Sequence, residues 1–494
     1  MNPRALAALE LWNARNSAGR DRAFAVYMAF MVALVAVVPV ARAVWVSVTS
    51  PAGVALFADV AAPGVASVIV AVLWAGALLV GRVRGPALLA PFLTHTLAMS
   101  DLRGADIFLR PMLRATALTT TATTTVTVTI GASLAQHGIV SVLDVALFGV
   151  GGVLAGAVTG VLWLTGQVFP RAAAVAALSI LILAFVAFAT PALQVVAPWA
   201  WMGYPTQMSA PLIVALAALT AALLAAVPPV LNRLRHATLM TQSLRWDALV
   251  THATGMDFAS AVTMYRPHPR IGRRWRAVKP RRTLSATFFV RDAIGAMRTP
   301  GRLAIGVAAL AASGMLLALA LTPGAPAWLL GAAAGVIAFG GLGPLTDGLR
   351  HAASMAADFS PYGVSDRTLV AYHLLFPLVV TIAVLLAVVG VAALLMAVPS
   401  GSAVLSALLL GIFALGIRVN NAVKGPLPTT LLAPMPTPMG DPMAAVRVIW
   451  ALDALVLAAL LGAAAATLFS VPFFFTGIAV AIVGTAAMRW QRRR

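Results

Sequence analysis

Two aspartates occupy positions where a carboxylate is costly, because each lies within or beside a long apolar stretch. Asp453 lies about two turns inside one stretch and could bind a proton or a polar molecule; the alternative is a structural ion pair with Arg418 or Arg447. Asp144 lies near the start of another stretch and could form an outer gate with Arg42, unless that arginine extends to the membrane interface instead. Both aspartates are therefore candidates for a polar pathway.

A second source of polar groups is a run of nine threonines between Thr116 and Thr129. Their hydroxyls are spread around every face of a helix and could line a polar pathway, for which Thr120 and Thr124 are the candidates. Threonine hydroxyls in a helix can instead bond to the carbonyl four residues earlier. We favour this local bonding as the main use of the hydroxyls.

The residue types that bind metals or cleave nucleotides lack the necessary spacing. There is no cysteine, and the seven histidines are scattered without the spacing of ligands. Neither Lys279 nor Lys424 ends a glycine-rich loop of the kind that cradles phosphates. We therefore expect no metal site, no cofactor and no ATP hydrolysis by this chain.

The composition indicates that most of the chain is surrounded by lipid. Of its 494 residues, 61% are hydrophobic and 10% are charged, against roughly 25% charged in an ordinary soluble domain. Apolar stretches of about 20 residues, enough to cross a hydrocarbon core about 30 Å thick, recur along the sequence. Segments of alternating polarity are absent, so the spans are helices and not barrel strands. We predict an all-α polytopic membrane protein.

About twelve transmembrane helices are predicted, six in each half of the chain. Residues 1–22 are predicted as an amphipathic elbow segment, 23–232 as the first six-helix half, 233–301 as a cytoplasmic linker with a basic run and a second elbow helix, and 302–494 as the second six-helix half. The predicted spans are residues 24–48, 65–81, 113–135, 139–164, 171–193, 208–232, 302–322, 327–345, 368–397, 402–421, 446–468 and 470–489.

The distribution of lysine and arginine orients these spans, because both residues are retained on the cytoplasmic side of inserted helices. With the N-terminus inside, the six outer connections contain no lysine or arginine, and Arg42 is the one basic residue near an outer end. An even number of spans, with both termini in the cytoplasm, follows. The net charge of +20 is explained by this asymmetry and by attraction to anionic lipid, without nucleic-acid binding.

The predicted linker contains eight cations within residues 266–282. Such a run could bind a protein partner, but we favour a segment that lies on anionic lipid with Trp275 at the interface. The cations assigned to this lipid surface are Arg270, Arg273, Arg274, Arg276, Lys279, Arg281 and Arg282.

Two predicted cytoplasmic loops, each joining the second and third spans of its half, share an order of residues. Each begins with Gly-Pro and continues with a histidine, an aspartate and an arginine. These residues are Gly85-Pro86, His95, Asp101 and Arg110 in the first Gly-Pro loop (residues 85–110), and Gly343-Pro344, His351, Asp358 and Arg367 in the second Gly-Pro loop (residues 343–367).

A short amphipathic segment also precedes the first span of each half. In the second half, Phe289, Ala293 and Met297 share one helical face while Arg291 and Arg298 lie elsewhere, as in an interfacial helix. The N-terminal copy is less regular. The same order of features in both halves favours a parallel duplication.

This order of features resembles the membrane subunit of ABC-2-type exporters. Each half of that family has a cytoplasmic N-terminus, an elbow helix, six spans and a coupling helix between the second and third spans; two such halves look fused here. The resemblance implies export across the bacterial plasma membrane, driven by two copies of a separately encoded ATPase. The sequence is also similar to actinobacterial membrane proteins of this size, through Pro436–Asp441, Arg447 and Trp450–Asp453.

In that family the loop between the second and third spans docks on the ATPase, so the resemblance gives this role to both Gly-Pro loops. Their apolar side chains suit a groove on a partner; the alternative is that they pack against the bundle's own cytoplasmic end. The predicted docking residues are Leu93, His95, Leu97 and Asp101 in the first loop, and Leu349, His351 and Asp358 in the second.

Two other classes remain open. A secondary transporter of the major facilitator type also has six plus six spans, and residues 343–350 partly match that family's loop signature, although Gly348 replaces its basic residue. A membrane glycosyltransferase would need carboxylates in outer loops, where Asp59 is alone in its loop. We therefore expect an exporter permease first, with its substrate pathway at Thr120, Thr124, Asp144 and Asp453.

Overall fold

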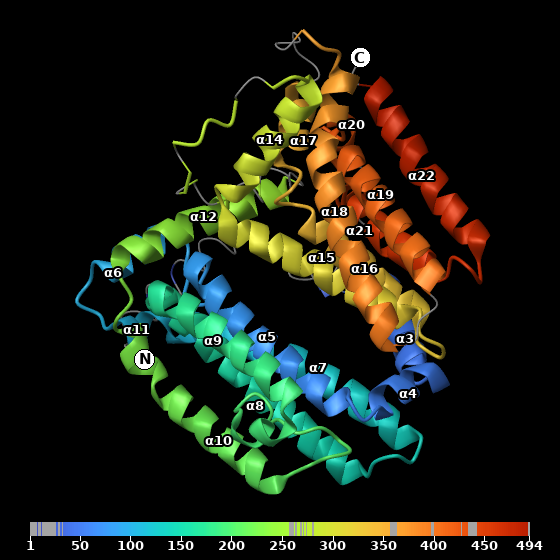
Figure 1. Cartoon of the computed structure of the whole chain (residues 1–494). Helices are drawn as coiled ribbons and strands as arrows, with labels where there is room; N and C mark the ends of the chain where they lie inside the picture. Colours follow the sequence, from blue (N-terminus) through green and yellow to red (C-terminus); the bar gives the residue numbers. More distant parts are fainter. Residues whose placement is uncertain are drawn as a thin grey trace. The chain divides into compact units, whose positions relative to one another are not determined.

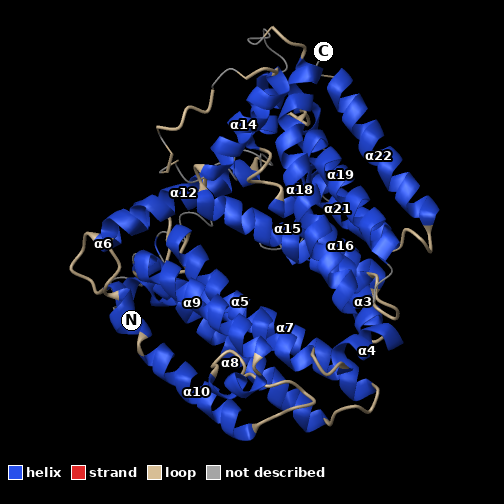
Figure 2. Ribbon diagram, viewed as in Figure 1, coloured by secondary structure: helices blue, strands red, loops and turns tan. Residues whose placement is uncertain are grey.

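The computed structural model describes most of the chain from residue 33 onward, with several gaps, and six residues before it. All regular structure among the described residues is helical and no strand occurs there (Figures 1 and 2). The described residues are 7, 11, 26–27, 30–31, 33–255, 261, 264–266, 269, 271–272, 274–278, 281–355, 363–396, 400–425, 427–432 and 442–492. The predicted N-terminal elbow, apart from residues 7 and 11, and the motif Pro436–Asp441 lie outside them.

Eight helices within the described residues are long and apolar enough to cross a membrane, and a bent pair brings the number to nine. The chain is thus a multi-pass α-helical membrane protein, as its composition predicts. The eight helices are α5 (Ala62–Val83), α8 (Val142–Val168), α9 (Pro170–Ala189), α15 (Pro300–Ala320), α18 (Asp366–Met396), α19 (Ser400–Ala422), α21 (Pro442–Ala466) and α22 (Pro472–Gln491).

The other four predicted spans differ from a single apolar helix for identifiable reasons. The first, predicted at residues 24–48, contains α3 (Val38–Val48), and α4 (Pro51–Ala58) follows it at an angle of 66°, where Ser50 caps α4. The third, α7 (Gly104–Gln136), has 33 residues, but its threonines make it less apolar. The sixth and eighth contain the apolar helices α10 (Ala210–Ala225) and α16 (Ala327–Gly341), of 16 and 15 residues. At about 1.5 Å per residue these are shorter than a hydrocarbon core of about 30 Å.

The chain divides into two compact units, Met1–Thr251 and His252–Arg494. This boundary falls inside residues 233–301, where the sequence predicts the linker. In the first unit α5 packs on α8 and α9, and α7 packs along α8, so that these four helices lie side by side (Figure 1). In the second unit α16 packs on α15 and α21, and α18 packs on α15 and α19.

The helix pairs in contact are partly the same in the two units. The predicted second and fifth spans of each half pack together (α5 with α9, α16 with α21), as do the third and fourth (α7 with α8, α18 with α19) and the fourth and sixth (α8 with α10, α19 with α22). Small residues allow the closest of these contacts: a methyl group added at Gly331 would lie 2.5 Å from the carbonyl oxygen of Gly462. Such close backbone approach is how helices associate in lipid.

Candidate functional site at the Gly-Pro loops

Each Gly-Pro loop contains a short helix, and the two helices bury and expose side chains at the same positions, counted from the first residue of the helix. The first loop contains α6 (Pro91–Ala98) and the second contains α17 (Asp347–Met355). In both helices the third residue is a buried leucine, Leu93 or Leu349, and the fifth is an exposed histidine, His95 or His351. One face of each helix is therefore held by its own unit and the other face is free to contact solvent.

Three of the predicted docking residues are buried, so the predicted docking surface is wrong at these positions. Leu93 and Leu97 are 6% and 7% exposed and belong to a core with Phe108 and Leu239, whereas Leu349 is 1% exposed. These three leucines do not form a docking surface. They pack against the chain's own helices, because each short helix lies on its own unit with its apolar face turned inward. Leu349 packs in a cluster with Phe288, Ala352, Leu369 and Val370.

The outer face of the first Gly-Pro loop carries exposed apolar side chains beside the predicted polar ones. Met99, directly after α6, is 68% exposed and Phe92 is 60% exposed. His95 and Asp101 are exposed, as a docking role requires, while Asp358 lies outside the described residues.

Charged side chains hold α17. Asp347, its first residue, accepts two hydrogen bonds from the Arg302 guanidinium, at 2.5 and 3.1 Å, and also pairs with Arg266. Burial raises the pKa of Asp347, but the bonds from Arg302 and Arg266 outweigh burial and bring the pKa below its ordinary value. This carboxylate thus joins the loop helix to the start of α15 and to the preceding linker.

A second, deeply buried pair lies behind α17. Nδ1 of His373 on α18 lies 2.6 Å from Oδ2 of Asp292 on α14 (Leu284–Met297), and the two side chains are 1% and 6% exposed. The edge of the Phe288 ring meets the imidazole, with centroids 4.9 Å apart. Nε2 of His373 is buried and has no hydrogen-bond partner in the described part of the chain. Removing either member of such a pair leaves the other uncompensated.

Gly348 of α17 covers this pair. A methyl group at residue 348 would lie 2.5 Å from Nδ1 of His373 and would also overlap the Asp292 carboxylate. Because residue 348 has no side chain, α17 can approach α14 and α18 closely at this point. This explains in packing terms why a glycine stands where the facilitator signature has a basic residue.

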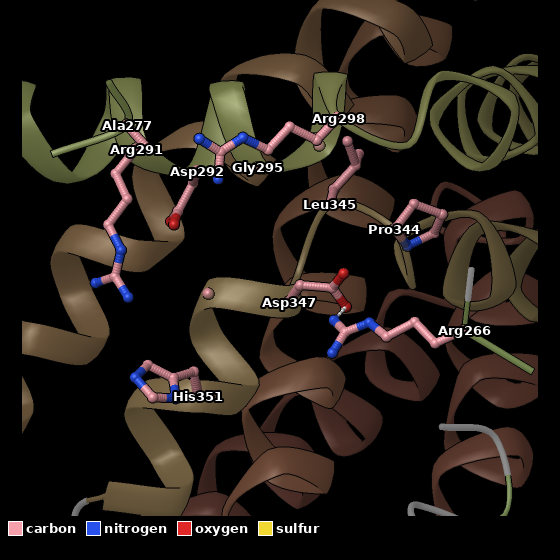
Figure 3. Close-up of a pocket in the computed structure, with 12 residues that line it drawn as sticks. Arg266, Ala277, Arg291, Asp292, Gly295, Arg298, Pro344, Leu345, Asp347 and His351 are labelled. Carbon is pink, nitrogen blue, oxygen red and sulfur yellow. Dashed lines mark ion pairs between the residues drawn. The ribbon is translucent and has the colours of Figure 1, made fainter. Parts of the chain in front are cut away.

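A cavity of about 340 Å³ opens between α14 and α17. Figure 3 shows Arg291 and Asp292 of α14 and the next residue after that helix, Arg298, along one side, and Asp347 and His351 of α17 along another. Burial, followed by the positive charge of Arg291, lowers the pKa of His351. The cavity is thus surrounded by fixed charges of both signs.

Neutral amides hold the first Gly-Pro loop. The backbone N–H of Gly85 donates to Oε1 of Gln242 at 3.0 Å, and the N–H of Ala87 donates to Oε1 of Gln167 at 3.2 Å. The two glutamines also bond to each other at 3.0 Å, between α8 and α12 (His236–Thr254). A side chain at residue 85 would overlap that of Gln167. Here too a glycine lies directly against a buried polar pair.

Thr120 and Thr124, the threonines predicted to line a pathway, lie where α7 packs against α8. A methyl group at Gly156 of α8 would be 2.5 Å from the Cα atom of Thr120, and one at Gly152 would be 3.2 Å from that of Thr124. Most of the other hydroxyls follow the favoured alternative and bond within α7, as Thr116 does to the carbonyl of Met112 at 3.0 Å. The described geometry thus gives these threonines a packing role, and a pathway role stays a prediction.

Asp144 lies at the exposed start of α8. Its carboxylate accepts hydrogen bonds from the backbone N–H and the hydroxyl of Ser141, at 2.9 and 2.7 Å, while Ser141 accepts one from the N–H of Asp144. This reciprocal arrangement is a capping box, which satisfies amide groups at a helix start.

Asp453 forms an ion pair, but the predicted partners, Arg418 and Arg447, are wrong. The carboxylate lies 2.6 Å from Nζ of Lys424 and also pairs with Arg489 of α22. Arg418 donates instead to the carbonyls of Phe339 and Gly340, and Arg447 to that of Leu431. Two cations, at the C-terminal ends of α19 and α22, therefore share one carboxylate in the middle of α21.

The basic run is described in part. Arg274, Arg276, Arg281 and Arg282 are exposed, and Trp275 is 46% exposed, as expected of a segment on a lipid surface. Arg270, Arg273 and Lys279 lie outside the described residues.

Two polar pairs were not predicted from the sequence, Asp292 with His373 and Gln167 with Gln242. Their members are 81 and 75 positions apart, so no local spacing reveals them. The first pair could have been suspected from His373, a lone ionisable residue in an apolar stretch, which needs a polar partner.

Comparison with known proteins gives no assignment. No family model, no curated protein and no solved structure matches the chain. In the part of the chain that the structure describes, no group of three or more histidine, aspartate or glutamate side chains could hold a metal ion.

Proposed function

We propose that the chain is the membrane permease subunit of an ABC-type exporter, which moves a substrate across the bacterial plasma membrane with a separately encoded ATPase. One observation carries the proposal. Both halves place a short helix, α6 or α17, between the predicted second and third spans, with an anchored inner face and an exposed outer face. A permease that does not bind ATP itself needs such elements to receive the movement of its partner.

The anchoring contacts support this transmission. In the second unit α17 is joined to α15 by Arg302 with Asp347, and to α18 by the apolar contact of Leu349 with Leu369. In the first unit the loop is joined to α8 and α12 through Gln167 and Gln242. A displacement of either loop helix would therefore reach several spans of its own unit.

The docking surface in this proposal is the outer face of α6 and α17. It includes His95 and Met99 on the first loop and His351 on the second, in place of the buried leucines. Two ATPase copies would contact two loops, one for each half.

The proposal is tested by copurification of the native chain with a separately encoded ABC ATPase from the same cells. Met99→Asp should release the ATPase from a permease that stays monodisperse, because residue 99 is 68% exposed. Val60→Asp is the matched control, because Val60 is 91% exposed on a predicted outer connection. If Met99→Asp retains a coupled ATPase, or if no ATPase associates with the native chain, the proposal fails.

The proposal includes twelve spans with both termini in the cytoplasm. Reporters fused after residue 260 and at the C-terminus should then read cytoplasmic, and reporters near residues 56, 200 and 325 should read external. An external signal after residue 260 would contradict the six-plus-six arrangement.

A secondary transporter is the second candidate, and the ion network at Asp453 favours it. A carboxylate shared by Lys424 and Arg489 beside membrane helices is the kind of group that couples proton binding to movement. Transport that continues without any ATPase, and is lost in Asp453→Asn while the protein still inserts, would favour this class.

A further inference from the structure

A second cavity, of about 330 Å³, lies beside Gly85-Pro86 in the first unit. It differs from the α17 cavity because no aspartate or glutamate is among its lining residues, all of which are described. Its cations are Arg84 and Arg114, its aromatic residues are Trp163 and Trp246, and the other lining residues are Gly85, Pro86, Leu88, Leu89, Pro111, Ala115 and Leu118.

The cavity lies at the depth where the apolar parts of three helices end. On α5 the run without charged residues stops at Gly81, directly before Arg82, and Arg84 follows two residues later. On α7 no charged residue occurs from Ala115 to Gln136, directly after Arg114. Trp163 lies near the C-terminal end of α8. Tryptophan and arginine at the end of membrane helices mark the level of lipid headgroups.

The two arginines are arranged differently. The Arg84 guanidinium lies 3.3 Å from the centroid of the Trp246 ring, while the indole N–H of Trp163 donates to the Arg84 carbonyl at 2.6 Å. These contacts fix the position of Arg84. Arg114 is exposed and has no ion pair within the described residues. One cation is therefore preorganised and the other is available to a ligand.

The cavity reaches the apolar part of α7. Leu118, one turn after Arg114 on α7, is 69% exposed and lines the cavity. A ligand that reaches Arg114 along this helix must therefore carry an apolar chain next to its anionic group. A free anion in water would gain nothing from Leu118, whereas a phospholipid presents both parts in this order.

We propose that this cavity binds the phosphate of an anionic phospholipid between Arg84 and Arg114, with an acyl chain along Leu118. Arginine holds a phosphate through charge-assisted hydrogen bonds, and the two indoles provide the amphipathic wall of a headgroup site. The site is separate from the basic run of the linker and does not rest on the exporter proposal.

The test is native mass spectrometry of the full chain in detergent, titrated with phosphatidylglycerol, phosphatidylcholine or inorganic phosphate. The native chain should retain phosphatidylglycerol in preference to phosphatidylcholine. Arg114→Gln should weaken the first binding event about fivefold, the effect of removing one cation near a lipid surface. Arg114→Lys should restore most of the affinity.

Arg110→Gln is the matched control, because Arg110 is exposed one turn earlier on α7 and does not line the cavity. Arg84→Gln gives a second variant with an equal or larger loss. An equal loss in Arg110→Gln would indicate only surface charge and would overturn the proposal. No preference for phosphatidylglycerol, or displacement of the lipid by inorganic phosphate at similar concentration, would also overturn it.

Discussion

Each Gly-Pro loop places a glycine against a buried polar pair, but the two pairs differ in chemistry. In the first loop, Gly85 lies against the neutral pair Gln167 and Gln242. In the second loop, Gly348 lies against a carboxylate and an imidazole, those of Asp292 and His373. Side-chain amides carry no charge at any physiological pH. The same packing of a glycine against a polar pair is therefore built from neutral groups in one half and from ionisable groups in the other.

The largest effect is expected at Asp292. Asp292→Ala leaves the His373 imidazole buried without its partner, which should cost about 3 kcal/mol of unfolding free energy. Asp101→Ala, at an exposed aspartate of the first loop, is the control and should change stability by less than about 0.5 kcal/mol. Denaturant unfolding in detergent measures both. Similar losses in the two variants would show that the buried pair does not stabilise the folded chain.

Gly348→Ala should come next. The added methyl group lies 2.5 Å from Nδ1 of His373 and must separate the pair or move α17, an overpacking expected to cost about 1–3 kcal/mol. Gly295→Ala is the control, since nothing lies within 4 Å of a methyl group at this residue of α14. Thermal unfolding of the two variants should differ clearly, and equal midpoints would show that the contact is not tight.

The amide pair of the first loop should give a smaller and pH-independent loss. Gln242→Leu removes the bond to the Gly85 N–H and the bond to Gln167, each worth about 1 kcal/mol net. Gln207→Leu, at an exposed glutamine outside the loop, is the control. The difference between the two variants should be constant from pH 5 to 8; a pH-dependent difference would contradict the distinction between the loops.

The smallest effect is expected from protonation of His351. Its pKa is lowered in the folded chain, where Arg291, His373 and Asp292 surround it. The unfolded chain binds this proton near pH 6.5. Stability should therefore fall as the pH drops below about 6.5, until the folded pKa is reached. Asp347, whose pKa is also lowered, should lose its contribution only below about pH 4.

His351→Gln should remove part of the loss between pH 7 and 5. The matched control is His95→Gln at the equivalent position of α6, where the loop is held by amides. Unfolding midpoints of the two variants and the native chain, measured across this pH range, give the comparison. An unchanged pH slope in His351→Gln would show that the imidazole does not sense the charges around it.

The sequence predicts the long helices well because hydropathy is local. Ala62–Val83 and Pro300–Ala320 differ from their predicted spans by a few residues. The helix α4 after Ser50 and the end of α16 at Gly341 were not predicted, since apolar composition alone does not determine where a helix begins or ends. The inward direction of Leu93 and the partner of Asp453 depend on side chains distant in sequence, which periodicity does not show.

The most direct test of the exporter proposal uses the absence of cysteine from the chain. His95→Cys and His351→Cys, each carrying a photo-crosslinker at an exposed position of α6 or α17, report the neighbours of the two outer faces. Both should attach to the same ATPase polypeptide, while Val60→Cys should not. Crosslinks from neither loop helix to any ATPase, in cells where the chain is inserted and transport is active, would contradict the exporter proposal.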